Sequence, residues 1–108
     1  MQRLPTDLGD LGRFEEPAVL ILTSLLEKPR HGYAIVKDVE TVAGVHLGPG
    51  TLYATLTRLE ARGLIEALPA EDRRRPYRIT DAGLAVVRVR LERLEAIART
   101  GLRRLARV

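Results

Sequence analysis

The spacing of hydrophobic residues predicts three helices before residue 63. Apolar positions recur every three or four residues in each of three segments, which is the periodicity of a helix with one buried face. Proline or glycine follows each segment, and these residues commonly end helices. The segments span residues 15–28, 31–43 and 49–62. The region before them has little periodicity, so we expect a flexible N-terminal arm over residues 1–14, which can include a short helical turn.

After Gly63 the pattern changes to two short runs that predict a β-hairpin. The stretches "LIEAL" at 64–68 and "PYRIT" at 76–80 are brief, and a polar, turn-rich loop joins them. Thr80 has a side chain suited to capping a helix, and Asp81 is an acidic residue suited to a first turn. We therefore expect a mainly α chain with one small hairpin, an α+β fold that closes with a long helix over residues 81–108.

The last helix carries a hydrophobic stripe at heptad-like spacing. The stripe contains Leu84, Val87, Leu91, Leu94, Ala98 and Leu105. A helix that outruns a small body must bury this stripe elsewhere, and a second copy of the chain is the simplest partner. The alternative is that the stripe folds back onto the first helix of its own chain. We expect a homodimer that forms through residues 81–108.

The third expected helix, Pro49–Arg62, has one hydrophobic face and one face of short side chains. At about 100° per residue, one sector contains Leu52, Leu56 and Leu59. The other face contains Thr51, Ala54, Thr55 and Arg58. Short outer side chains let a helix lie deep in a groove, and the B-DNA major groove, ~12 Å wide, admits one helix. Threonine can contact phosphates or base edges, and arginine can bind guanine or a phosphate.

Composition fits a polyanion partner and excludes several other classes. The formal net charge is +4 and the computed pI is about 10.1. One arginine cluster, Arg73–Arg75, lies in the expected hairpin loop, whereas the arginines after residue 87 are better explained as a solvated helix face. The absence of cysteine excludes disulfides and thiol catalysis. We see no secretory signal and no run of ~20 apolar residues, so we expect a soluble, cytoplasmic protein without a membrane span.

No constellation of residues in the sequence predicts catalysis, a metal site or a cofactor. His31 and His46 are the only histidines, and without cysteine they offer no metal-ligand set. Glu15 and Glu16 are adjacent on a helix and point about 100° apart, which is poor geometry for a paired acid and base. A Ser/His/Asp set and a phosphate-cradling glycine loop are both absent from the sequence. We therefore expect no enzyme activity.

The order of helix, helix, helix, hairpin and long helix is that of a winged helix-turn-helix module. Several motifs then make the chain similar to the PadR-like family of transcriptional regulators. They are "HGY" at 31–33, "GTLY" at 50–53, "RLE" at 58–60, "GLI" at 63–65 and "YRIT" at 77–80. This resemblance implies a dimeric winged-helix repressor whose C-terminal helix dimerises, often against the partner's N-terminal helix. It also implies that some relatives respond to a small aromatic effector.

One departure from the family pattern lies in the hairpin. The family commonly has two adjacent tyrosines where this chain has Pro76 and Tyr77, and proline removes a backbone donor from the return strand. Glu71 and Asp72 also oppose the approach of phosphate unless neighbouring arginines pair with them. The contacts of this hairpin with DNA can therefore differ from those in relatives.

The candidate DNA contacts come from the second helix, the third helix and the hairpin loop at 69–76. They are Tyr33, Lys37, Thr51, Tyr53, Thr55, Arg58, Arg73, Arg74 and Arg75. The alternative interpretations are packing tyrosines, an ordinary exposed helix face and a solvated loop. We expect residues 15–80 to bind double-stranded DNA at a pseudo-palindromic operator as a homodimeric repressor. The main alternative function is a winged-helix protein-interaction module.

Overall fold

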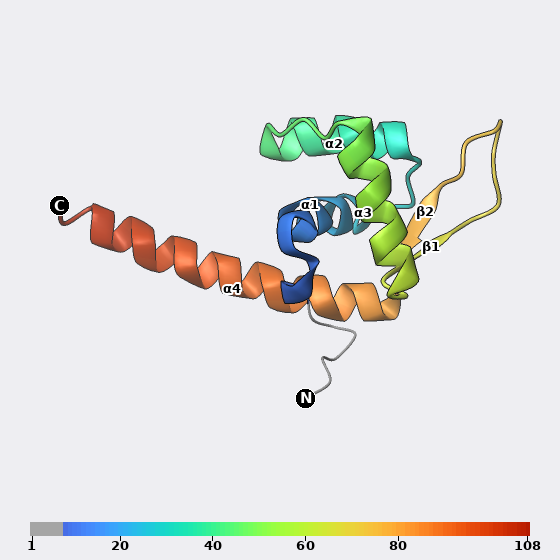
Figure 1. Ribbon diagram of the computed structural model, residues 1–108. Coiled ribbons are helices and arrows are strands. Elements are labelled where there is room, and N and C mark those ends of the chain that lie inside the picture. Colours follow the sequence, from blue (N-terminus) through green and yellow to red (C-terminus); the bar gives the residue numbers. More distant parts are fainter. Residues whose placement is uncertain (1–7) are drawn as a thin grey trace.

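The computed structural model describes residues 8–108 and confirms a mainly helical chain with one antiparallel hairpin (Figure 1). The elements are the 3₁₀ helix η1 (Gly9–Phe14), α1 (Glu15–Leu25), α2 (Gly32–Ala43), α3 (Pro49–Ala61), β1 (Ile65–Ala67), β2 (Tyr77–Ile79) and α4 (Asp81–Leu105). This is the winged-helix arrangement of three helices, a hairpin and a long final helix that the sequence predicts.

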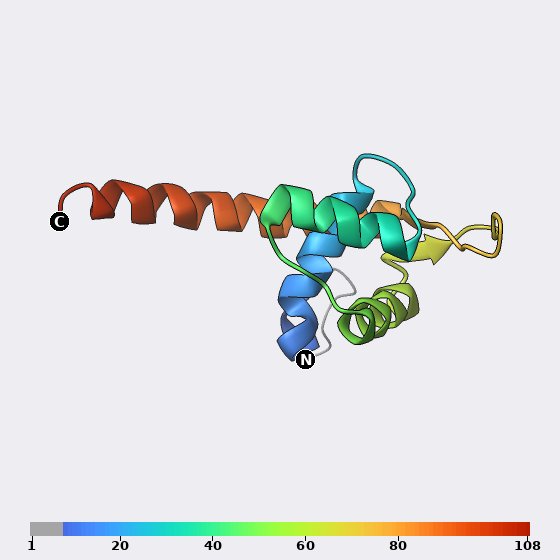
Figure 2. The same cartoon turned by 90° about the horizontal axis from the view of Figure 1, so that it is seen from above.

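Helix α1 lies at the centre and packs against every other helix (Figure 2). Its buried residues are Ala18, Val19, Ile21, Leu22 and Leu25. The helix ends at Leu25, before the expected stop at Pro29, and Leu26 is exposed. Because α1 supplies the core of a small domain, the helices around it have their outer faces free for other contacts.

Local sequence signals fix the ends of the next helices. The His31 side chain caps α2 by accepting a hydrogen bond from the Ala34 N–H. Gly63 adopts φ 72° after α3, and the Leu64 N–H then donates to the Leu59 carbonyl at 3.0 Å. The Thr80 hydroxyl caps α4 by accepting from the Gly83 N–H at 3.1 Å. These contacts match the helix boundaries that the sequence predicts.

The hairpin is short and is tied to the loop between α1 and α2. Strands β1 and β2 pair with Ile65 opposite Ile79. Arg30 forms two backbone hydrogen bonds with Tyr77, so the α1–α2 loop extends this small sheet. The Arg30 side chain is only 12% exposed, donates to the Ser24 carbonyl and pairs with Glu27 and Asp38. The base of the hairpin is therefore held firmly against the helices.

The segment before α1 is packed where we expected a loose arm. Leu8 and Leu11 are buried in the core, and Asp10 forms an ion pair at 2.7 Å with Arg62, the residue that follows α3. Residues 8–14 thus belong to the folded body, because their leucines reach the core despite the lack of helical periodicity. The remainder of the expected arm, residues 1–7, lies outside the described residues.

Helix α4 has a packed first half and a projecting second half (Figure 1). Val86 and Val87 are buried against the body, and Arg90 forms an ion pair with Glu15 of α1. Beyond this point the helix extends away from the other elements, on the side opposite the hairpin. Within residues 8–108 no helix is both long enough and apolar enough to cross a membrane.

Candidate nucleic-acid interface

Helix α3 presents the two faces that the sequence predicts, with one residue misplaced. Leu52, Leu56 and Leu59 are buried, whereas Thr51 and Arg58 are exposed. Ala54 lies between them and is half-buried. The exposed face of α3 therefore has small side chains and one arginine, a shape that suits insertion into a groove.

Thr55 does not belong to this exposed face. Its side chain is 0% exposed, and its hydroxyl donates to the Thr51 carbonyl at 2.6 Å. Four residues advance a helix by slightly more than one turn, so Thr55 lies about 40° beyond Thr51, towards Leu59. The expectation that Thr55 faces DNA was therefore wrong.

Thr57 lies on the exposed face of α3, although it is not among the expected DNA contacts. It is exposed, and its hydroxyl donates to the Tyr53 carbonyl at 2.9 Å. At about 100° per residue, Thr57 lies roughly opposite the buried leucines of α3. The same periodicity that identified those leucines would have identified it.

Arg58 lies flat on an aromatic ring that the sequence argument did not connect to it. Its guanidinium carbon is 3.9 Å from the centroid of the Phe14 ring, and its Nη1 donates to the Ala54 carbonyl at 2.9 Å. The guanidinium carbon of Arg13 is 5.0 Å from the same centroid. No local pattern links these residues, because η1 and α3 are far apart in the sequence.

Two exposed tyrosines flank the start of α2. Tyr53 of α3 reaches so close to Gly32 that a Cβ atom there would lie 2.9 Å from the Tyr53 hydroxyl oxygen. A larger residue at position 32 would therefore push the Tyr53 hydroxyl away from this place. The Tyr33 ring stacks near His31, and Lys37 Nζ lies 5.6 Å from the Tyr33 ring centroid. Three expected contact residues, Tyr33, Lys37 and Tyr53, are therefore exposed on neighbouring parts of one surface.

The tip of the hairpin, the wing, is a tight turn that exposes its arginines. Asp72 and Arg73 have φ angles of 48° and 67°, and Glu71 and Arg74 exchange two backbone hydrogen bonds. Positive φ at both central residues is typical of a two-residue hairpin turn, where Asn or Asp followed by Gly is usual. Arg73, Arg74 and Arg75 are all exposed. An arginine thus occupies a conformation that glycine normally prefers.

A hollow of about 380 Å³ separates the wing from the two tyrosines. Its lining includes His31, Gly32, Tyr33, Tyr53, Arg73, Arg74, Arg75 and Tyr77. Burial raises the pKa of the Tyr77 hydroxyl, and the charge of Glu60 raises it further, so this phenol stays a neutral hydrogen-bond donor. Hydroxyl donors and arginines thus meet around one space, and this chemistry suits a phosphate group.

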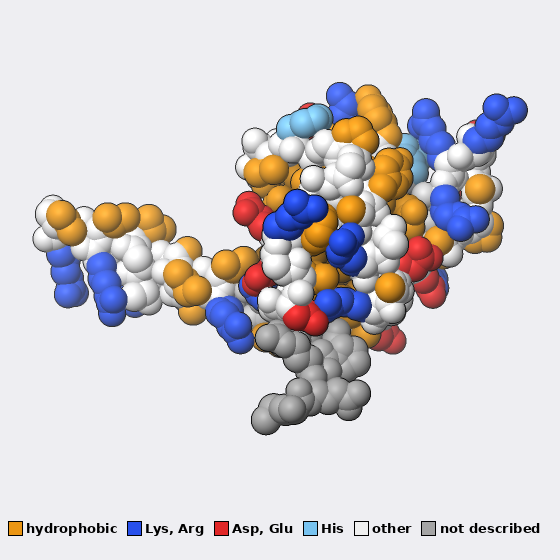
Figure 3. Space-filling view, in the orientation of Figure 1, with side chains coloured by type: hydrophobic (Ala, Val, Ile, Leu, Met, Phe, Trp, Pro, Cys, Tyr) orange, Lys and Arg blue, Asp and Glu red, His pale blue; other side chains and the backbone are white. Residues whose placement is uncertain are grey.

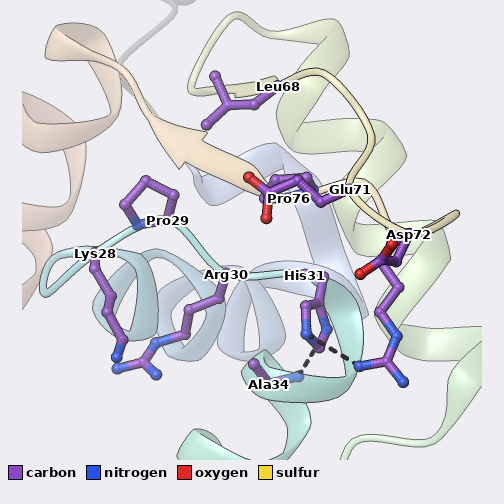
Figure 4. Close-up of a pocket in the computed structure, with 10 residues that line it drawn as sticks. Lys28, Pro29, Arg30, His31, Ala34, Leu68, Glu71, Asp72 and Pro76 are labelled. Carbon is purple, nitrogen blue, oxygen red and sulfur yellow. Dashed lines mark hydrogen bonds between the residues drawn. The ribbon is translucent and has the colours of Figure 1, made fainter.

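A second hollow lies on the other side of the wing and has a mixed charge (Figure 4). Its volume is about 790 Å³, and both Lys28 and Glu71 line it. Nη1 of Arg74 lies 3.5 Å from Nε2 of His31 across its edge. Acidic residues, including Asp72, make this side less suited to a polyanion.

The expected dimerisation stripe on α4 is exposed only beyond the body. Val87 is 1% exposed, so it packs in its own chain and was wrongly assigned to an interface. Leu91 is half-buried, whereas Leu84, Leu94, Ala98 and Leu105 are exposed. Two residues missing from our expectation, Ile97 and Leu102, are exposed on the flanks of this stripe.

Figure 3 shows how the two kinds of surface are separated. Basic side chains gather over α3 and at the wing, while hydrophobic side chains follow one side of the projecting part of α4. A hollow of about 560 Å³ lies where η1, α1 and α4 meet, and its lining is made of Gly12, Arg13, Glu15, Glu16, Val19, Leu20, Arg90 and Leu94. Among residues 8–108, no group of three His, Cys, Asp or Glu side chains could hold a metal ion.

Comparisons of the sequence and of the structure with known proteins point to the same family. Residues 21–89 match the model of the transcriptional regulator PadR-like family. An uncharacterized 37.1 kDa protein in transposon TN4556 of Streptomyces fradiae is 45% identical over 71 residues, which cover 66% of this chain and 21% of that protein. The chain thus spans about a fifth of the length of this relative.

Two further relatives are regulators of similar size. Transcriptional regulator Rv3488 of Mycobacterium tuberculosis is 42% identical over 82 residues, which cover 73% of this chain and 76% of that protein. The crystal structure of a PadR family transcription regulator from Clostridium difficile R20291 matches with a TM-score of 0.73 at 26% identity. The match covers 82% of this chain and 96% of that one.

Proposed function

The chain belongs to the PadR-like family of transcriptional regulators, and on this premise we propose that it is a homodimeric DNA-binding repressor. Residues 15–80 bind DNA, and residues 81–108 hold two copies together. One α3 enters the major groove of each half of a pseudo-palindromic operator. The two half-sites lie about 34–36 Å apart, or a multiple of that distance.

The observation that carries this proposal is the exposed face of α3. Thr51, Ala54 and Thr57 leave room for a groove wall, and Arg58 lies at their side. A protein partner would favour large aromatic anchors at the centre of an interface, whereas Thr51, Ala54 and Thr57 are small and the exposed aromatic residue of α3, Tyr53, lies at their flank. The shape and charge of this surface therefore support DNA over the alternative of a protein-interaction module.

The wing and the two tyrosines supply the backbone contacts in this proposal. Arg73–Arg75 follow phosphates or enter the minor groove, while Tyr33 and Tyr53 donate hydroxyl hydrogen bonds to phosphate. Lys37 adds a contact from the exposed side of α2. Such contacts position the protein without reading sequence, whereas the α3 residues read the bases.

The exposed apolar stripe supports the dimer. Leu94, Ile97, Leu102 and Leu105 are exposed beyond the body. Burying them in a second copy removes this apolar area from water, and the hollow between α1 and α4 offers Val19, Leu20 and Leu94 as an apolar strip for the partner's helix. A small aromatic effector stays a prediction, tested by titrating phenolic compounds into the protein–DNA complex.

The test is fluorescence anisotropy with DNA from upstream of the protein's own gene and with a scrambled duplex, at several salt concentrations. We expect tight binding to the first duplex, weak binding to the second and a steep dependence on salt. A reporter gene behind the bound sequence then separates repression from activation. Equal, weak binding to every duplex, together with capture of one cellular protein, would favour the interaction module instead.

A further inference from the structure

A hollow lies beside the start of α3, between this helix and η1. Its volume is about 400 Å³, and Arg13, Phe14, Gly50, Thr51 and Ala54 line it. Three of these residues belong to α3, and Thr51 and Ala54 lie on its exposed face. The other two come from η1. Arg13 is the one charged residue among the five, so η1 adds a positive charge beside the exposed face of α3.

Phe14 restrains the side chain that the proposed function assigns to base contact. Arg58 lies 3.9 Å above its ring, and its Nη1 is engaged by the Ala54 carbonyl. Stacking and this hydrogen bond together restrict a long side chain that would otherwise sample many rotamers. In the part of the chain that the structure describes, Nη2 and Nε have no hydrogen-bond partner, so this edge of the guanidinium is left for DNA.

The ring itself is held by the fold. Phe14 is half-buried and packs against the core, and Leu11, three residues earlier, is buried. An ion pair between Asp10 and Arg62 connects η1 to the C-terminal end of α3. The position of the ring relative to α3 is therefore set before any ligand arrives, which is the condition for preorganised recognition.

Arg13 and Arg58 differ from the arginines that connect parts of the fold. Arg30, Arg62, Arg78 and Arg90 each form an ion pair with a carboxylate. Among residues 8–108, Arg13 and Arg58 form none, although both guanidinium carbons lie within 5.0 Å of one ring centroid. Two like charges around one ring favour the approach of an anion.

We propose that η1 is a further DNA-contacting segment besides α2, α3 and the wing, in which Phe14 positions Arg58 for base reading and Arg13 binds a phosphate. This inference rests on the proposed function, because it assumes that α3 enters the major groove. It makes Phe14 a specificity-determining residue without any contact between Phe14 and DNA. It also extends the footprint of each subunit beyond α3 and the wing.

The test of Phe14 starts from a duplex that the wild-type protein selects from a randomised library, and from its single-base variants. Phe14→Leu keeps an apolar side chain but removes the π face. We expect about a fivefold weaker affinity for the selected duplex, the size of one exposed cation–π contact, and a flatter response to one base position. Phe14→Tyr keeps the ring and should restore both properties. Phe14→Met is a second variant should the leucine protein fail to fold.

A double-mutant cycle separates positioning from general destabilisation. In the Arg58→Ala background, Phe14→Leu should cause no further loss of affinity or discrimination. Equal losses in both backgrounds would overturn the positioning role, because Phe14 would then act without Arg58. Thermal unfolding of each protein shows whether the population is folded at the temperature of the binding assay.

The role of Arg13 is tested by Arg13→Gln. We expect weaker binding to every duplex, and a salt slope smaller by about 1, as for the loss of one phosphate contact. Arg103→Gln, on the polar side of the projecting α4, is the control and should leave the slope unchanged. If the wild type selects no sequence at all, the proposed function fails. If the wild type selects a sequence and the Phe14→Leu and Arg13→Gln proteins match it, only this inference fails.

Discussion

The surface around α3 and the projecting part of α4 are both exposed, but they have opposite chemistry. On α3, Thr51 and Thr57 are exposed, and beside them Arg13 and Arg58 share the Phe14 ring and form no ion pair within residues 8–108. On α4 the exposed residues of the stripe are leucines and an isoleucine, with Leu94 45% and Ile97 62% exposed. Exposure alone therefore says little about function until the type of side chain is considered.

This difference assigns each surface a different kind of partner. Removing a stripe of aliphatic side chains from water lowers the free energy, so the favoured partner of this stripe is another apolar surface. Arg13 and Arg58 are hydrated in the free protein, and a partner that covers them must replace this hydration with negative charge, so this surface favours a polyanion in a partly hydrated interface. In our proposal the α4 stripe joins two chains, and the dimer then holds the two α3 surfaces at the spacing of the operator's half-sites.

The largest expected effect comes from making the α4 stripe polar. Replacing Leu94 and Ile97 together by Asp should give monomers, because two charges cannot be buried in an apolar interface. Operator affinity should then fall by about two to four orders of magnitude, the gain that linking two binding sites usually provides. Light scattering measures the mass of the particle, and anisotropy measures the affinity.

The control for this change is Arg103→Asp, on the opposite side of the same helix. It also introduces a carboxylate on α4, but it should leave the dimer intact. A double-aspartate variant that remains a dimer would place the interface elsewhere. The exposed leucines of α4 would then need an explanation other than dimerisation.

A smaller effect is expected from Arg58→Ala on the exposed face of α3. Loss of a guanine contact should cost ~1–3 kcal/mol on the selected operator and reduce discrimination at one base position. The protein should remain a dimer, because α3 does not lie along the projecting part of α4 (Figure 1). Affinities for a set of single-base operator variants measure the effect. An equal loss on all variants would show that Arg58 binds only phosphate.

At the wing tip, binding and stability should change in opposite directions. Arg73→Gly removes a charge but places glycine where φ is 67°. The salt slope should fall by about 1, while the free energy of unfolding should rise by about 1 kcal/mol as left-handed strain is relieved. Arg75→Gln is the matched control, since it removes a charge elsewhere in the loop and should give only the change in slope.

The sequence predicts the hairpin and the ends of the helices that His31, Gly63 and Thr80 cap, because these signals are local, whereas it places the end of α1 three residues too late. His31, Gly63 and Thr80 act within a few residues of the helix end that each one caps. The hairpin follows from two short runs around a polar loop, and both strands lie within the predicted stretches. Capping and turn chemistry can be found without knowing how the elements pack.

What the sequence misses depends on contacts between distant segments. Val87 fits the heptad of α4, yet it is buried because the first half of α4 lies against the body of its own chain. The contact between Phe14 and Arg58 joins η1 to α3, and no spacing rule connects them. Leu8 and Leu11 are similarly core residues in a segment without periodicity. Each case needs the packing of whole elements, which periodicity does not contain.

The smallest expected effect concerns Thr55 and tests the boundary of the exposed α3 face. Thr55→Val keeps the shape of a buried side chain and removes one hydroxyl whose only described acceptor is the Thr51 carbonyl. Operator affinity should stay unchanged, and the free energy of unfolding should change by less than about 1.5 kcal/mol. Thr51→Val, on the exposed side one turn earlier, should instead weaken operator binding while leaving stability nearly unchanged. If Thr55→Val weakens binding as strongly as Thr51→Val, α3 must rotate or open on DNA. The division between its buried and exposed faces would then describe only the free protein.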